Sequence, residues 1–161
     1  MFKLHIDVPS DFDTRTKKEF FDMVWTRYRM IAMQAFRMIS MKTPVDTGWA
    51  RANWHMTFDE PSNSTSISLK TDMMAQLSVL NTVKQGSVPA AIYIANNVMY
   101  MDMLEFGLFP KNPLYGSAPK GKLAKGEKRV KTIRTVNGFS RQAPEGMIAP
   151  TVKELAGFLG M

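Results

Sequence analysis

One long helix, predicted over residues 10–42, constrains the fold of this chain more than any other sequence feature. Apolar side chains recur three or four positions apart, which is the spacing of one helix face. Ser10, Asp11 and Asp13 offer N-cap oxygens, and Pro44 disfavours helical geometry at the residue before it. Because a helix of about 30 residues exceeds the usual length of roughly 11–12, we expect part of it to pack outside its own domain. The stripe expected to be buried is Phe21, Val24, Tyr28, Ile31, Ala35 and Met38, widened by Phe20, Trp25, Phe36 and Ile39.

Shorter elements follow the long helix. Alternating apolar and polar residues predict an antiparallel hairpin of strands at 52–58 and 65–70. A short helix at 72–84, a buried strand at 91–95 and a short helix at 98–106 come next. We expect Trp54, Met56 and Phe58 to face the long helix, and a terminal helix to bury Ile148, Val152, Leu155 and Leu159.

The predicted fold class is therefore α+β. It has a long N-terminal helix packed on a small, mostly antiparallel sheet, with short helices and a C-terminal helix. All of these elements belong to one predicted structural domain, residues 1–161.

The segment at residues 108–142 differs from the rest because it is rich in Pro, Gly and Lys. Its nine cations against the single Glu127 give it a charge of +8, and the whole chain carries +7, so the remainder is near −1. Counterion release favours binding of such a segment to a polyanion, but it lacks the regular aromatic array of nucleic-acid modules. We interpret it as a long basic loop or insert that contacts partner subunits or DNA. The candidate contact residues are Lys111, Lys120, Lys122, Lys125, Lys128, Arg129, Lys131, Arg134 and Arg141.

Motifs that resemble catalytic or ligand sites lack the surroundings they require. Asp46 begins the D-T-G triplet of aspartic proteases, but that chemistry needs two carboxylates sharing one proton, and the triplet occurs once. A G-x-x-x-x-G-K spacing at 116–122 is followed by Leu123 in place of the hydroxyl residue that reaches Mg²⁺. Cysteine is absent, His5 and His55 have no metal-ligand spacing, and no apolar run approaches the roughly 20 residues of a membrane span. The sequence predicts no enzyme, no cofactor, no metal site and no membrane partner.

Three blocks of the sequence resemble the blocks of one family, in the same order. TPVDTGWARANW at residues 43–54 resembles a TPVDTGRLRxSW pattern, and QAPEGMI at 142–148 resembles QAPxGMV. Between them, YIANNVMY at 93–100 and LEFG at 104–107 resemble I-x-N-x-x-x-Y-A-x-x-L-E-x-G. These patterns are those of tailed-phage minor tail protein Z-like and neck-type tail-completion proteins. The matching positions are Pro44, Asp46, Gly48, Arg51, Trp54, Asn96, Tyr100, Glu105, Gly107, Pro144 and Gly146.

The resemblance implies a structural protein that is made in the host bacterial cytoplasm and resides in the tail or neck of the virion. It implies a ring, a homo-hexamer, at the head-proximal end of the tail, which helps join tail to head. The implied partners are the tail tube, the tail terminator or the head–tail connector, with transient contact to passing DNA. Two alternatives remain open: a nucleic-acid-binding accessory protein that uses the segment at 108–142, and a tail terminator.

Overall fold

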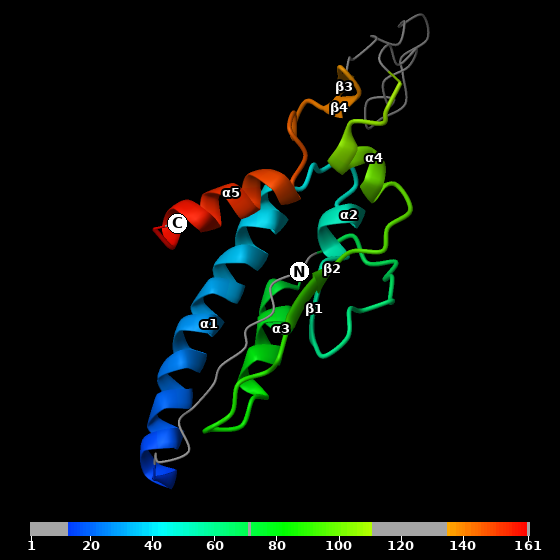
Figure 1. Cartoon of the computed structure of the whole chain (residues 1–161). Coiled ribbons are helices and arrows are strands. Elements are labelled where there is room, and N and C mark those ends of the chain that lie inside the picture. The colour runs from blue at the N-terminus through cyan, green and yellow to red at the C-terminus, as the bar shows by residue number, and fades with distance from the viewer. Residues whose placement is uncertain (1–12, 71, 111–134, 161) are drawn as a thin grey trace, which may run out of the picture.

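The computed structural model describes residues 13–70, 72–110 and 135–160. The fold is α+β, as predicted: a long helix, α1, lies along a two-stranded antiparallel sheet and several short helices (Figure 1). A second small sheet, β3–β4, and the C-terminal helix α5 complete the described part of the chain. The elements are α1 (Thr14–Lys42), α2 (Trp49–Ala52), β1 (His55–Phe58), α3 (Met73–Ser78), a 3₁₀ turn (Val79–Asn81), β2 (Ile92–Ala95), α4 (Met101–Phe106), β3 (Thr135–Val136), β4 (Phe139–Ser140) and α5 (Ile148–Phe158).

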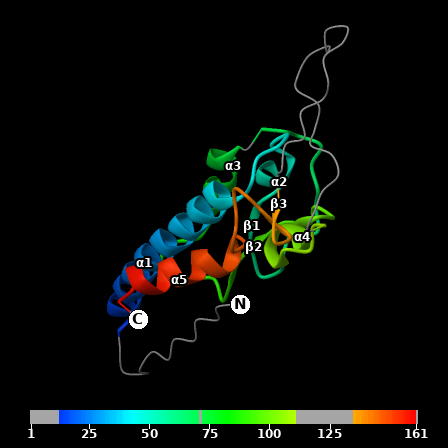
Figure 2. The same ribbon diagram turned by 90° about the horizontal axis from the view of Figure 1, so that it is seen from above.

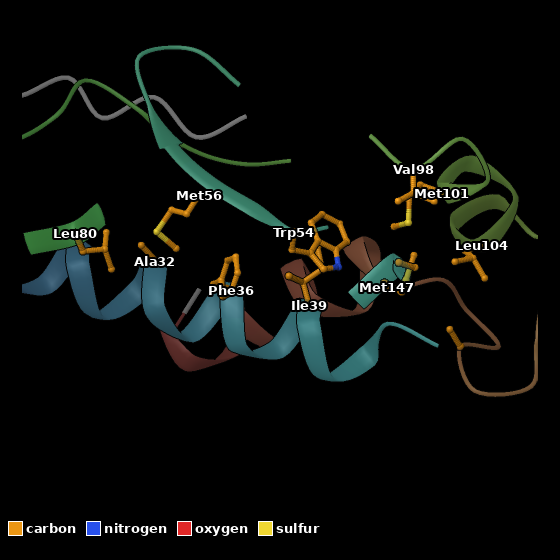
Figure 3. Close-up of a cluster of buried hydrophobic side chains, with 12 residues drawn as sticks. Ala32, Phe36, Ile39, Trp54, Met56, Leu80, Val98, Met101, Leu104 and Met147 are labelled. Carbon is orange, nitrogen blue, oxygen red and sulfur yellow. The ribbon is translucent and has the colours of Figure 1, made fainter. Parts of the chain in front are cut away.

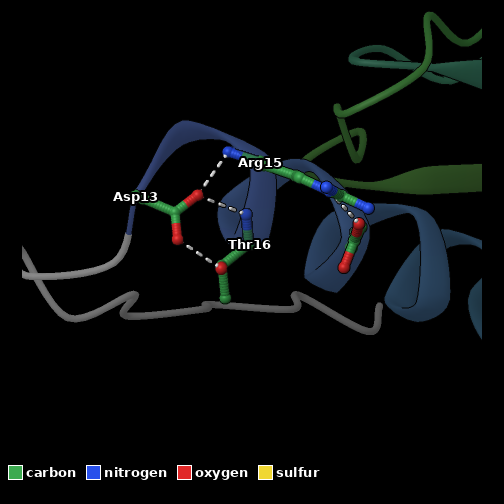
Figure 4. A network of polar contacts seen from close by, with 4 residues as sticks. Asp13, Arg15 and Thr16 are labelled. Atoms are coloured by element: carbon green, nitrogen blue, oxygen red, sulfur yellow. Dashed lines mark hydrogen bonds and ion pairs between the residues drawn. The ribbon is translucent and has the colours of Figure 1, made fainter.

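Helix α1 begins at an acidic cap. The Asp13 carboxylate accepts hydrogen bonds from the Arg15 and Thr16 amides at 2.8 and 3.0 Å and from the Thr16 hydroxyl at 2.7 Å (Figure 4). These bonds, those from Thr16 above all, lower the pKa of Asp13. Asp13 is one of the three predicted cap residues; Ser10 and Asp11 lie outside the described residues. At the other end Thr43 is the C-cap, next to Pro44 as predicted.

The predicted centre of the buried face of α1 is wrong in position. The six residues of the central stripe are all half-buried, whereas Ala32, Phe36 and Ile39, about a quarter turn away, are fully buried. Phe36 and Ile39 were predicted only at the margin of that stripe. The reason is that α1 packs on two sides: Trp25 lies edge-to-face on Phe58 of β1, and Lys42 pairs with Glu154 of α5 at 2.5 Å. A wide face is therefore covered instead of one narrow stripe.

The predicted hairpin between 52–58 and 65–70 is also wrong. Strand β1 pairs with β2, with Met56 opposite Ile94, and residues 61–68 form no strand. Tertiary packing decides the partner because β2 is the more apolar strand, while the 65–70 segment alternates Ser and Thr with two apolar residues that stay exposed. The first strand also begins later than predicted, at His55 instead of residue 52, because Trp49–Ala52 is helical. Burial of Trp54 and Met56 on one face was predicted correctly.

Helices α3 and α4 and strand β2 agree in place with the predictions and differ in length, whereas β3 and β4 pair inside the segment predicted as a loop, 108–142. The expected helix at 72–84 is α3 followed by a 3₁₀ turn ending at Asn81, and the expected helix at 98–106 is reduced to α4. Gly107 adopts positive φ as the C-cap of α4, and Gly86 does so five residues beyond the 3₁₀ turn. In α5, Leu155 is buried as expected but Ile148, Val152 and Leu159 are exposed, and Thr151 is buried instead. The expected apolar side of α5 therefore faces mostly away from α1.

The core lies between α1, β1, α4 and the segment that enters α5. Figure 3 shows Phe36 and Ile39 of α1 beneath Trp54 and Met56, with Met147 at the junction to α4. Phe36 and Met147 have no exposed surface, and Met56 has 1%. Methionines thus contribute directly to the core, where their flexible side chains fill irregular gaps.

Candidate functional site

The turn after α1 is built on Thr43 and the two side chains that reach it. The Thr43 hydroxyl donates to the Ile39 carbonyl at 2.7 Å and accepts from the Trp54 indole N–H at 2.8 Å. Arg51 Nη2 donates to the Thr43 carbonyl at 2.8 Å and to the Met41 carbonyl at 3.3 Å. Carbonyls at a helix C-terminus lack intrahelical partners, and a cation there also suits the helix dipole. Trp54 and Arg51 therefore fix how the chain leaves α1.

The reversal that follows depends on Gly48. Its φ of 96° lies in the left-handed region, and a Cβ there would overlap the carbonyl oxygen of Leu69. The loop at residues 61–70 thus lies directly against this turn. Gly48 is therefore required both for backbone geometry and for this close approach.

Two asparagines connect this turn to the rest of the molecule. Asn53 is fully buried, and its side chain bonds both the Ser66 amide, at 2.5 Å, and the Ser66 carbonyl, at 3.1 Å. Asn96 Nδ2 donates to the Ala50 carbonyl at 2.7 Å, while its Oδ1 accepts from the Val98 amide at 3.1 Å. An asparagine side chain offers donors and an acceptor together, so it can replace strand pairing between segments.

Glu105 joins the second sequence block to the third. Its carboxylate accepts from the amides of Met147 at 2.7 Å, Ile148 at 2.9 Å and Ala149 at 3.2 Å, which are the free N–H groups at the start of α5. A negative charge at a helix N-terminus is favourable. Gly146 lies so close that a Cβ would come within 2.6 Å of the Glu105 carbonyl oxygen. The L-E-x-G and Q-A-P-x-G-M patterns therefore describe two halves of one contact.

Gly107 and Gln142 complete the joint. Gly107 ends α4 with φ 65°, and a Cβ there would come within 2.5 Å of the Phe139 ring of β4. The Gln142 side chain accepts from the Val45 amide at 2.8 Å and donates to the Val45 carbonyl at 3.1 Å. In this way Gln142 pairs with the turn after α1 much as a strand residue would.

The three blocks surround an open cleft of about 710 Å³. Its walls are residues 44–50, then Tyr100 and Leu104 at α4, then Phe109, Thr135 and residues 140–142. Trp49 and Tyr100 lie with ring centroids 5.8 Å apart at its edge. Burial raises the pKa of the Tyr100 phenol; a backbone hydrogen bond to Ala50 opposes this shift, and the charge of Asp46 adds to it. The cleft is therefore an aromatic and polar surface carrying a neutral tyrosine at pH 7.

The structure places five of the predicted site residues at this cleft. Pro44, Asp46, Gly48, Tyr100 and Arg141 line it. Pro144 is exposed and forms an isolated bridge with Gly146. Eight of the nine candidate basic residues lie outside the described residues, namely Lys111, Lys120, Lys122, Lys125, Lys128, Arg129, Lys131 and Arg134.

Sequence reasoning missed the roles of three polar side chains. Asn53 alternates with the apolar residues of the strand predicted at 52–58, which places it on the exposed face, yet it is fully buried. Glu105 lies at the end of the helix predicted at 98–106, and the sequence indicated no other role for it. His55, expected at the surface, is half-buried; its Nε2 atom is buried with no hydrogen-bond partner among the described residues. Asn53 bonds Ser66, 13 positions away, and Glu105 bonds Met147, 42 positions away, so local periodicity carries no sign of these contacts. The one signal in the sequence was that Asn53 and Glu105 fall within the blocks that resemble tail-completion proteins.

Neither a metal-binding cluster nor a helix fit to cross a membrane is found in the part of the chain that the structure describes. No cluster of three or more His, Asp or Glu that could hold a metal occurs among residues 13–70, 72–110 and 135–160. Within the same ranges no helix is both long and apolar enough to cross a membrane. Comparison with sequence families, with curated proteins and with solved structures finds no match to this chain.

Proposed function

We propose that this chain is a structural protein of a tailed-phage virion, a tail-completion or neck subunit that forms a ring at the head-proximal end of the tail. The observation that carries the proposal is the meeting of the three sequence blocks at one joint. Glu105 caps α5 next to Gly146, and Gln142 pairs with Val45 in the turn between Pro44 and Gly48. The residues by which the chain resembles tail-completion proteins thus act on one another, which supports reading them as parts of one fold.

The chemistry of the joint favours a structural role over an enzymatic one. Glu105 is occupied by three backbone amides, and Arg51 is directed at backbone carbonyls. Asp46 is the one carboxylate that lines the cleft among the described residues, whereas an aspartic protease needs two that share a proton. We therefore expect Asp46→Asn to leave particle assembly largely intact, apart from any effect on folding.

The partners in this proposal are further copies of the chain, with a hexamer implied by the family resemblance, and the tail tube, tail terminator or head–tail connector. Exposed apolar side chains on α1, α5 and the loop after β1 support such contacts, because large exposed apolar surface marks interaction sites.

Electron microscopy of lysates from phage lacking this chain tests the proposal. We expect filled heads and separate tails, with joining restored by adding the purified protein. Normal joined particles in its absence would refute a tail-completion role. The nucleic-acid-binding alternative instead predicts DNA affinity that falls steeply as salt rises, with a slope set by the number of phosphates neutralised.

A further inference from the structure

Helix α1 carries a row of exposed methionines on the side away from the core. Met23, Met30, Met33 and Met41 are 57, 57, 38 and 64% exposed. At 3.6 residues per turn they fall within an arc of about 80° and span about 27 Å of helix. Four large apolar side chains exposed on one helix face form an apolar patch, and such patches mark interaction sites. Methionine suits a face that repacks against a partner.

The same face is basic. Arg37 lies within the methionine arc and Arg27 directly beside it, and both side chains are exposed. Between Met23 and Met41 the helix has no acidic residue. We call Met23, Met30, Met33, Met41, Arg27 and Arg37 the methionine face.

A second exposed apolar surface has the opposite charge. In the loop between β1 and α3, Ile67 is 96% and Leu69 55% exposed, and Met74 in the first turn of α3 is 78% exposed. Asp59, Glu60 and Asp72 in the same stretch are exposed, against one exposed cation, Lys70. We call Ile67, Leu69, Asp59 and Glu60 the acidic loop; Asp72, the N-cap of α3, and Met74 in α3 lie outside it.

The two surfaces point in different directions. Figures 1 and 2 both show α1 on one side of the β1–β2 pair and the loop after β1 on the other. The acidic loop is also held in place, since Asn53 bonds Ser66 and Asn97 Nδ2 donates to the Ser62 carbonyl at 2.6 Å. Two exposed surfaces on different sides of one copy, both apolar and of opposite charge, are the arrangement that a head-to-tail contact requires.

We propose that the methionine face of one copy binds the acidic loop of the next copy, and that this contact closes the ring. The inference rests on the ring in the proposed function and names its interface. Arg27 and Arg37 would meet Asp59 and Glu60, while Ile67 and Leu69 would cover the methionines. The contact is heterologous, so each copy uses one surface in each of its two interfaces.

Charge exchange between two variants tests the contact in the purified full-length protein by analytical ultracentrifugation. One variant carries Arg27→Glu and Arg37→Glu, and the other carries Asp59→Asn and Glu60→Lys. Asparagine is chosen at position 59 because Asp59 has φ 65°, a conformation that Asn tolerates. We expect wild type to form oligomers, each variant alone to associate at least about tenfold more weakly, and an equimolar mixture to recover because the altered surfaces then complement each other.

A matched apolar pair completes the design. Ile67→Ser should weaken association, whereas Met99→Ser, at a residue that is 88% exposed but belongs to neither surface, should not. Urea unfolding verifies that each variant is folded. The proposal is overturned if wild type is monomeric at all concentrations, if the charge variants associate normally, or if their mixture fails to recover. Binding of the methionine face to anionic phosphatidylserine vesicles in place of self-association would also overturn it.

These outcomes are separate from those of the proposed function. Oligomers that recover on mixing, from a chain that phage particles do not need, would keep the interface and refute the phage role. Suppose instead that phage lacking the chain produce tails without heads, and that the purified chain does not self-associate. The phage role would then stand and the interface would be refuted.

Discussion

Single polar side chains hold the joints between elements in this protein. Glu105 receives three amides of the α5 N-terminus, and Asn53 bonds both backbone groups of Ser66. Because each of these side chains serves groups that would otherwise lack partners, removing one costs more than an exposed hydrogen bond would.

Replacement of Glu105 tests the α5 cap. We expect Glu105→Ala to lower the free energy of unfolding by about 1–2 kcal/mol, as lost helix caps do, and to speed hydrogen exchange at Met147, Ile148 and Ala149. Glu105→Gln keeps an acceptor oxygen and should lose less. Glu145→Ala, at an exposed acidic residue nearby, is the control and should be nearly neutral. Equal losses in Glu105→Ala and Glu145→Ala would show that the cap contributes nothing.

His55 gives the fold a pH dependence whose sign follows from burial. Burial lowers the pKa of His55 below 6.5, so the unfolded chain takes up a proton before the folded chain does. The contribution of neutral His55 to the free energy of unfolding is therefore fully present above pH 6.5. It is lost as the pH drops through 6.5 toward the pKa of His55 in the folded chain. Urea midpoints measured from pH 8 to pH 5.5 should show this loss, and His55→Gln should abolish it. Loss of the dependence in His5→Gln instead would contradict the assignment.

At the scale of elements, what could be predicted from the sequence depended on how local the signal is. Neighbouring residues indicate the long helix and its end next to Pro44, and both are observed. Gly107 ends α4 in the same local way. Strand pairing is not local, because β1 pairs with β2, about 37 positions away along the chain. The nearer segment at 65–70 also alternates apolar and polar residues but is not the partner. The joint at Glu105 and Gly146 was marked by the sequence blocks, but its contacts required the fold.

Trp54 links the end of α1 to β1, and its removal tests that packing. The side chain is 3% exposed and its indole N–H donates to Thr43. We expect Trp54→Ala to cost about 3–5 kcal/mol in urea unfolding, and Trp54→Phe to cost less because it keeps an aromatic ring. A loss below about 1 kcal/mol for Trp54→Ala would contradict the observed packing.

The junction of α4 with β4 depends on Gly107. A side chain there would meet the Phe139 ring, and its φ of 65° disfavours residues with a Cβ by about 1–2 kcal/mol before any clash. Gly107→Ala should therefore destabilise by more than that amount. Gly157→Ala in α5 has open space around it and should stabilise by up to about 1 kcal/mol. If the two alanine variants are equally stable, the junction is not as tight as the structure indicates.

At the scale of the whole molecule, the interior is held by a small core and by joints, while several apolar side chains remain outside. Ile67 and Met41 are among the most exposed, and they lie on surfaces of opposite charge. A subunit of this kind is suited to an assembly in which neighbouring copies cover what the single chain leaves open.

Electron cryomicroscopy of purified phage particles is the most direct test of the proposed ring. A ring at the head-proximal end of the tail should fit this chain, with α1 of one copy against the loop at residues 59–72 of the next. Particles that contain no copy of the chain, or that carry it at another position, would contradict the account.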